Sequence, residues 1–131
     1  MLSHDRFVYV DKKMNTWGRT MSHLQLKAGE LERLTKNHPD KVPVFVSKST
    51  HSKDSTPDIR KNKFLVPSVF TMGEFLATLR RWIQLTPEQA VYVFIGNSLP
   101  MTGATMGELH AQHKGSDGVL RMTYALENTF G

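Results

Sequence analysis

Apolar residues recur with helical spacing in the first third of the chain. Between Met21 and Asn37 they lie three or four residues apart, as on one face of an α-helix. Gly29 interrupts this pattern, so two short helices or one bent helix would both fit. Pro39 disfavours helix beyond Asn37. We therefore expect residues 1–37 to form an N-terminal extension with helices.

Two apolar runs with strand character follow this region. Lys41–Lys48, KVPVFVSK, is rich in β-branched residues, and Pro43 removes one ladder donor. The strand is therefore expected at an edge of a sheet or with an irregularity. Residues 47–62 are polar and include a proline, which is typical of a loop. KFLVP predicts a second short strand that ends at Pro67.

The second half of the chain alternates helix and strand signals. Thr71 and Glu74 have the spacing of a capping box at the start of TMGEFLATLRRWIQL, whose apolar residues mark one helix face. Residues 90–95, AVYVFI, predict a strand buried on both faces, followed by a turn at Gly96-Asn97. Residues 105–114 predict a short helix that ends at the turn GSDG, and residues 119–124 predict the last strand.

This order of elements predicts an α+β fold. A hairpin with a helix packed on one face of a mixed sheet is the ubiquitin-like β-grasp, and we expect this fold with an N-terminal helical extension. The expected division is residues 1–37 for the extension, 38–125 for the β-grasp core, and 126–131 for a flexible tail.

The composition narrows the possible functions. The 131 residues suit one domain, with 39% hydrophobic and 22% charged residues. No cysteine is present, which excludes a disulfide framework, a thiolate nucleophile and cysteine-ligated zinc. The net charge of +5 is scattered and accompanies no nucleic-acid-binding motif, so we expect no nucleic-acid partner. The longest apolar run, residues 90–95, is far shorter than a membrane span, and the start lacks a signal-peptide pattern.

Several blocks of the sequence resemble one protein family. HPDKVPVFV, KFLVPSVFTMGEFLATLRRWIQL, VFIGNSLPMTGATMGELHAQHKGSDGVLRMTY and the closing FG are similar to the autophagy ubiquitin-like modifiers. These are the GABARAP and microtubule-associated light-chain-three proteins and yeast autophagy-related protein eight. The similarity runs from about Leu24 to Gly131. The long N-terminal lead, Trp82 and Val119 depart from the family pattern.

The resemblance implies that the protein is a modifier and an adaptor rather than an enzyme. Enzymes with catalytic cysteines would activate Gly131 and transfer it to phosphatidylethanolamine, and a deconjugating cysteine protease would release it. The protein would then be cytoplasmic, and on autophagosomal membranes when lipidated. Phe130 would be the recognition residue of the tail. A glycine suits this chemistry because a residue without Cβ leaves its carbonyl open to attack.

The resemblance also implies that autophagy receptors bind through an aromatic-x-x-aliphatic motif. We expect the strand from Val42 to Val46 to form the edge that accepts the peptide. Lys61, Lys63 and Arg80 would meet acidic residues beside the motif. The aromatic pocket is expected to contain Glu30, Leu34, Pro43, Phe45, Lys63, Leu65 and Val119. The aliphatic pocket is expected to contain Phe64, Val66, Pro67, Phe70, Phe75 and Leu79.

Two other functions remain open at this stage. The chain could be a noncovalent ubiquitin-like adaptor. It could also be a modifier attached to a protein lysine, but that sibling family typically ends in Trp-Gly, whereas this chain ends in Phe-Gly, which argues against it. Phe75 and Leu79 also suit plain core packing. His110 and His113 have metal-ligand spacing on a helix, but no third ligand follows, so we expect no metal site and no cofactor.

Overall fold

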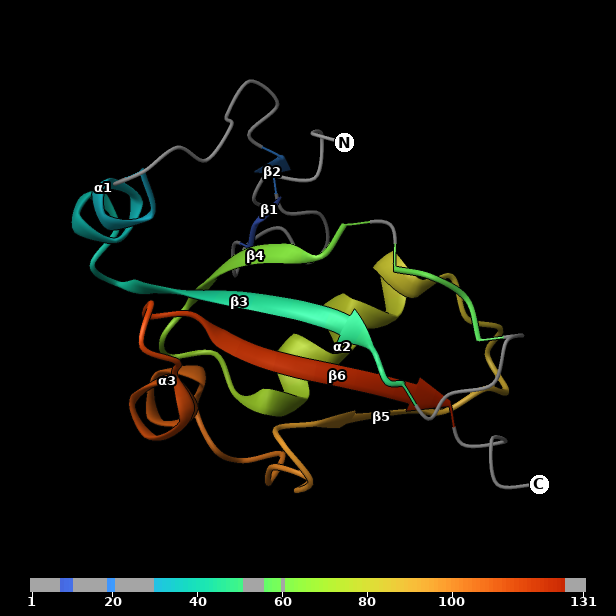
Figure 1. The fold of residues 1–131 in the computed structure, drawn as a ribbon. Coiled ribbons are helices and arrows are strands. Elements are labelled where there is room, and N and C mark those ends of the chain that lie inside the picture. The colour runs from blue at the N-terminus through green and yellow to red at the C-terminus, as the bar shows by residue number, and fades with distance from the viewer. Residues whose placement is uncertain (1–7, 11–18, 21–29, 51–55, 60, 127–131) are drawn as a thin grey trace.

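The computed structural model describes residues 8–10, 19–20, 30–50, 56–59 and 61–126 (Figure 1). These residues contain six strands and three helices. In chain order the elements are β1 (Val8–Tyr9), β2 (Arg19–Thr20), α1 (Glu30–Asn37), β3 (Lys41–Lys48), β4 (Lys63–Pro67), α2 (Met72–Ile83), β5 (Val91–Phe94), α3 (Met106–His113) and β6 (Leu120–Leu126).

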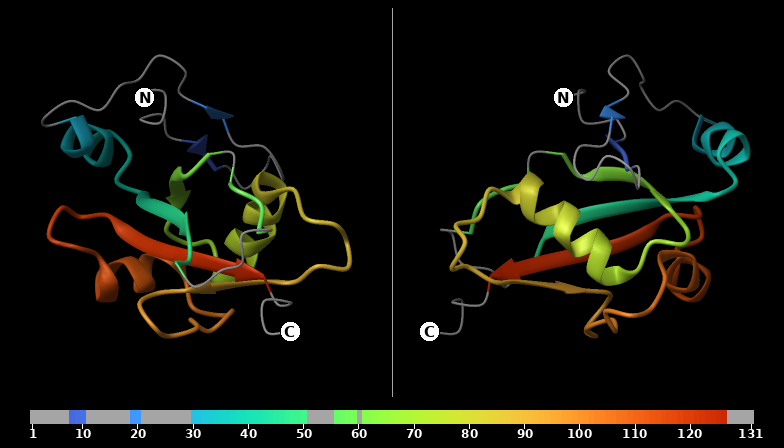
Figure 2. Two further views of the ribbon diagram at one scale, coloured as in Figure 1. Left: turned by 45° about the vertical axis from the view of Figure 1, so that its right-hand side comes forward. Right: turned by 180° about the vertical axis from the view of Figure 1, so that it is seen from behind.

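The strands form one mixed sheet with the order β2-β1-β4-β3-β6-β5. β3 and β4 make an antiparallel hairpin, β5 and β6 are antiparallel, and β3 and β6 run parallel at the centre. Helix α2 crosses behind these strands, as the view from the back shows (Figure 2). This arrangement confirms the predicted β-grasp fold.

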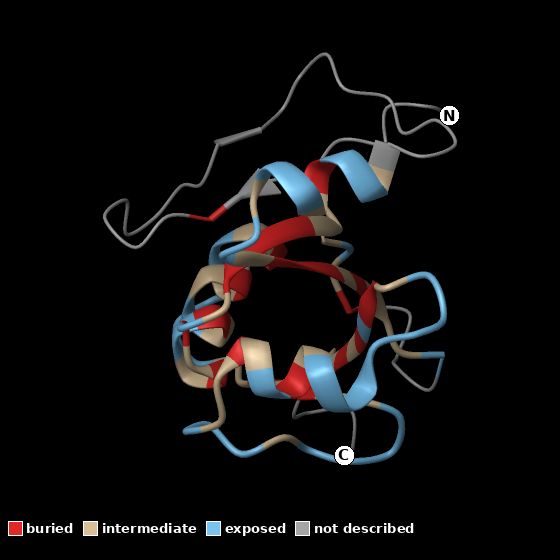
Figure 3. Cartoon of the chain, turned by 90° about the vertical axis from the view of Figure 1, so that its left-hand side faces the viewer, coloured by how far each residue is buried: buried red, intermediate tan, exposed pale blue. Residues whose placement is uncertain are grey.

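The main core lies between α2 and one face of the sheet. Every second residue of β3 is buried in it, from Val42 through Val44 to Val46, because successive strand side chains point to opposite faces. From α2, Phe75 and Leu79 are fully buried in the same cluster. Viewed from the side, buried residues line the inside of the fold, whereas α1 has an exposed outer surface (Figure 3).

Helices α2 and α3 both begin with the same four residues, Thr-Met-Gly-Glu. At α2 the Glu74 amide donates to the Thr71 hydroxyl oxygen at 3.1 Å, and the Thr71 amide donates to the Glu74 carboxylate at 2.9 Å. This confirms the predicted capping box. At α3 Thr105 and Glu108 form the same pair of hydrogen bonds, at 3.2 and 3.1 Å. Each box satisfies two donors at a helix N-terminus.

Pro43 led us to expect the strand Lys41–Lys48, which is β3, at a sheet edge or with an irregularity, and the edge position is wrong. β3 pairs with β4 on one side and with β6 on the other. The Val46 amide donates to the backbone carbonyl of Asn62 on the β4 side, at 2.9 Å. Because amide directions alternate along a strand, the Pro43 nitrogen faces the β6 side. The ladder with β6 begins only at Val44, so Pro43 removes no ladder hydrogen bond. A central strand tolerates the proline for that reason.

The prediction for residues 90–95 also needs correction. The strand is shorter, Val91–Phe94, and among the described strands it pairs with β6 alone, at the edge of the sheet. Val91 and Val93 are buried, whereas Tyr92 and Phe94 are half-buried. The strand therefore buries one face fully and not both. The predicted turn at Gly96-Asn97 is confirmed, with Gly96 at a φ of +62° and an Ile95–Ser98 bridge across it.

The N-terminal region contains two short strands that the sequence pattern did not predict. β1 pairs with β4, and β2 pairs with β1, so both extend the sheet of the core. The predicted helical region is described only from Glu30, where α1 begins, and its first half lies outside the described residues. No helix in the described ranges is both long and apolar enough to cross a bilayer.

Candidate peptide-binding site

The outer side of β4 is the margin of the β-grasp core. Alternation along the hairpin turns the backbone groups of Phe64 and Val66 toward β3, and those of Leu65 away from it. The Leu65 carbonyl accepts a hydrogen bond from the Val10 amide at 2.9 Å on that outer side. The strand that can accept an added strand is therefore β4, and the expectation that Val42–Val46 does so is wrong.

Four of the residues predicted for the aromatic pocket share one face of the hairpin. Pro43 is paired with Leu65 and Phe45 with Lys63, on the face opposite the main core. The Lys63 ammonium lies 5.8 Å from the centre of the Phe45 ring, within the range of a cation–π contact. Leu65 is fully buried and Phe45 is half-buried, so this face has a closed and an accessible part.

A pocket of about 340 Å³ lies on this face. Its lining consists of Leu31, Val44, Phe45, Lys63, Asp117, Val119 and Arg121. Three of these were predicted for the aromatic pocket. Leu34 and Val119 are buried, with 6% and 8% of their surface exposed. Glu30 begins α1, but its side chain lies outside what the structure describes.

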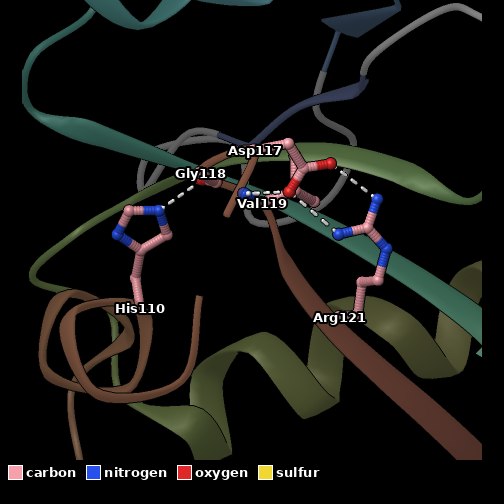
Figure 4. A network of polar contacts seen from close by, with 5 residues as sticks. All are labelled: His110, Asp117, Gly118, Val119 and Arg121. Atoms are coloured by element: carbon pink, nitrogen blue, oxygen red, sulfur yellow. Dashed lines mark hydrogen bonds and ion pairs between the residues drawn. The ribbon is translucent and has the colours of Figure 1, made fainter. Parts of the chain in front are cut away.

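A hydrogen-bonded network links Asp117, in the turn before β6, to Arg121 on β6 (Figure 4). Both residues line the pocket, one acidic and one basic. Asp117 accepts two hydrogen bonds from the Arg121 guanidinium, at 3.0 and 2.8 Å, and one from the Val119 amide at 3.2 Å. The Arg121 hydrogen bonds are the main cause that lowers the pKa of Asp117 to about 2. From α3, the His110 Nε2–H donates to the Gly118 carbonyl at 2.7 Å. The turn is thus held from two sides.

Sequence reasoning missed Leu31, Asp117 and Arg121 as pocket residues. In the sequence analysis Leu31 belongs to a helical apolar pattern, Asp117 to the predicted turn GSDG, and Arg121 to the predicted last strand. The spacing of Val119 and Arg121, two residues apart, is the signal that could have placed both on one face of the last strand.

The residues predicted for the aliphatic pocket are all buried. Phe64, Val66, Phe75 and Leu79 have no exposed surface, and Phe70 has 6% exposed, while Pro67 is also buried. Phe64 packs edge-on against Phe75, with ring centres 5.5 Å apart, and against Trp82 at 6.4 Å. Val10, with 3% of its surface exposed, belongs to the same packed cluster. The predicted aliphatic pocket is therefore closed to solvent in the described structure.

The structure does not bring all predicted charge contacts to the pocket. The Arg80 guanidinium donates to the Gln89 and Thr86 carbonyls, at 2.8 and 3.3 Å, in the loop after α2. Lys61 is half-buried two residues before β4. Phe130 and Gly131 lie outside the described residues, so the tail role stays a prediction. In the described part of the chain, no three His, Asp or Glu side chains are grouped to hold a metal ion.

Comparison with known proteins identifies the family. A family model described as "Autophagy protein Atg8 ubiquitin like" matches residues 25–131. The chain belongs to the Atg8 family. Autophagy-related protein 8a of Arabidopsis thaliana is 44% identical over 108 residues, which are 82% of this chain and 87% of that protein. Autophagy-related protein 8 of Vanderwaltozyma polyspora is 42% identical over 102 residues, covering 78% and 85%.

A solved structure shows the same fold. The crystal structure of Trypanosoma brucei ATG8 superposes with a TM-score of 0.70, at 34% identity, and covers 76% of this chain and 84% of that one. This Atg8-family chain is therefore a ubiquitin-like autophagy protein and not an enzyme. The family match begins at residue 25, so β1 and β2 lie outside the matched region.

Proposed function

We propose that this Atg8-family protein is a modifier joined through the Gly131 carboxyl to phosphatidylethanolamine, and an adaptor for receptors with aromatic-x-x-aliphatic motifs. The observation that carries the adaptor role is the outer side of β4, which accepts a parallel strand beside a pocket of about 340 Å³. The family match, which extends to Gly131, supports the modifier role.

The proposed conjugation has three chemical steps: adenylation, thioester formation and attack by the lipid amine. A partner enzyme adenylates the Gly131 carboxylate with ATP and releases pyrophosphate. The thiolate of an enzyme cysteine then displaces AMP and forms a thioester. The amine of phosphatidylethanolamine attacks that carbonyl, loses a proton and releases the thiol, which leaves an amide. Since the chain has no cysteine, every thiol belongs to a partner. Two acyl chains then hold the protein on autophagosomal membranes.

Reconstitution tests the modifier role. The protein is incubated with ATP, matching activating and conjugating enzymes, and liposomes that contain phosphatidylethanolamine. We expect a lipidated species by mass spectrometry, and none with Gly131→Ala. A matched control is the same mixture with phosphatidylcholine liposomes, which offer no primary amine. If Gly131→Ala gives as much product as the wild type, conjugation through this residue is wrong.

The adaptor role depends on strand pairing and two anchor side chains. An aromatic anchor of about 200 Å² at about 25 cal/mol/Å² contributes on the order of 5 kcal/mol, and an aliphatic anchor about 2 kcal/mol more. Each strand hydrogen bond contributes about 1 kcal/mol. After several kcal/mol of association cost, the balance corresponds to roughly micromolar affinity. Binding of this strength is readily reversed.

Titration with a labelled peptide tests the adaptor role. The peptide carries acidic residues followed by Trp-x-x-Leu. Lys63→Ala is expected to weaken binding about three- to tenfold, because Lys63 lines the pocket and its charge would attract the acidic residues of the peptide. Lys114→Ala is the control, since Lys114 is exposed after α3. Equal losses in both variants would show that only net charge matters. Phe75→Ala is unsuitable here because Phe75 has no exposed surface and supports the core.

A further inference from the structure

The margin of β4 is already occupied by another part of the same chain. β1 lies next to β4 (Figure 1). The two strands pair in parallel, with Val8 beside Phe64 and Tyr9 beside Leu65. The Val10 amide continues this pairing through its 2.9 Å hydrogen bond to the Leu65 carbonyl. This is strand addition, the mode by which a bound peptide would extend the sheet.

The side chain of Val10 also occupies the apolar side of this margin. It is 97% covered and packs in the core cluster that contains Phe64, Val66 and Phe75. These three residues were predicted to form the aliphatic pocket. An aliphatic side chain from the N-terminal segment therefore closes the site that an aliphatic anchor of a ligand would fill.

The sequence of this segment has the spacing of the ligand class proposed above. Phe7-Val8-Tyr9-Val10 places an aromatic residue three positions before an aliphatic one, and Asp5 precedes it. Phe7 lies outside the described residues, so only its spacing enters the inference. The pairing with β4, the burial of Val10 and the aromatic-x-x-aliphatic spacing therefore point to the same mode of occupation.

We propose that β1, together with Val10, is an internal competitor that occupies the receptor-binding margin of β4 and must leave before a receptor peptide binds. The proposal rests on the adaptor role proposed above. It makes receptor capture a two-state process, in which only the chain with β1 displaced is competent.

The contact is short enough to be reversible. β1 and β2 share only two residue pairs with each other, and β1 shares two with β4. A two-stranded hairpin of this size has little stability of its own and depends on the strand beside it. A tethered segment has an effective concentration near 1 mM, so a weak intrinsic affinity of about 100 μM would occupy the margin about ten to one. Apparent receptor affinity would fall by about tenfold.

The test compares full-length variants with the Trp-x-x-Leu peptide as the probe. Val10→Asp places a charge in the buried site and is expected to release β1, so the peptide should bind about tenfold more tightly than to the wild type. Leu99→Asp is the matched control, because Leu99 is 59% exposed and follows β5 at the opposite edge of the sheet. Circular dichroism checks that each variant is folded. If Val10→Asp is unfolded, Val10→Ala is used, which removes most of the buried side chain, with an expected gain of about threefold.

Amide hydrogen exchange separates failure of this proposal from failure of the adaptor role. Release of β1 should speed the exchange of the β4 amides that face it, the Leu65 amide among them, by at least tenfold in Val10→Asp and not in Leu99→Asp. Faster exchange without peptide binding in any variant would refute the adaptor role and leave the displaceable contact supported. Unchanged exchange, or equal peptide affinity in wild type and Val10→Asp when both bind, would overturn the internal competitor.

Discussion

The two Thr-Met-Gly-Glu helix starts offer a matched pair of substitutions with opposite expected signs. Gly73 and Gly107 each follow a capping threonine by two residues. Replacing a helical glycine by alanine stabilises a protein by about 0.5–1 kcal/mol when space allows. At Gly73 a Cβ would meet its nearest atom, the Thr102 carbonyl oxygen, at 3.6 Å, which is an ordinary contact. Gly73→Ala should therefore raise the free energy of unfolding.

Gly107 has the same local sequence but a different neighbour. A Cβ there would lie 3.0 Å from Ser68 Cβ and 3.2 Å from the Ser68 carbonyl oxygen. Ser68 is held in place, because its amide donates to the Asp40 backbone carbonyl at 2.8 Å and its carbonyl accepts from the Gly107 amide at 2.9 Å. Overpacking of this kind costs about 1–3 kcal/mol. After the helix gain, Gly107→Ala should lower the free energy of unfolding by about 1 kcal/mol.

Thermal unfolding of the two single variants measures this difference. A gap of about 2 kcal/mol corresponds to about 8 °C in Tm for a chain of this size. Gly107→Ser, which keeps the crowded Cβ, should behave like Gly107→Ala. If both alanine variants gain stability equally, the close approach of Ser68 does not constrain α3, and the reasoning is refuted.

Three further predictions follow from single contacts. Tyr124→Phe removes a hydrogen bond of 2.6 Å from the buried hydroxyl to the Pro57 carbonyl, and urea denaturation should show a loss of about 1–2 kcal/mol; no loss would mean that the bond contributes nothing. Phe75→Ala should cost about 3–5 kcal/mol by the same assay, whereas Arg81→Ala, at an exposed site on the same helix, should stay within about 0.5 kcal/mol. Because folding lowers the pKa of Asp117 from 3.8 to about 2, its ionised form stabilises the fold fully above about pH 4, and this contribution is lost as the pH falls through about 2. Asp117 is exposed, so Asp117→Asn should reduce stability at pH 7 by less than about 1 kcal/mol, and this difference should shrink as the pH falls from 4 through 2.

Much of the fold could be predicted from local patterns along the chain. The strands Lys41–Lys48 and Lys63–Pro67 have the predicted bounds, and the capping box at Thr71 begins α2 as expected. These features depend on residues close in sequence, through alternation, helical spacing and hydrogen bonds across one turn. Family resemblance then supplied the candidate pocket, and three of its residues line the pocket in the structure.

Only the tertiary structure decided which strand is the margin of the core and what covers it. Pro43 suggested an edge, yet its nitrogen faces the β6 side just beyond the end of that ladder, which no local pattern reveals. Tyr9 and Leu65 are neighbours across 56 residues of sequence, and such pairing depends on the whole sheet. Local composition determines which segments form strands and helices. Their partners are chosen by burial and register in three dimensions, because a strand can satisfy its hydrogen bonds with any segment that fits beside it.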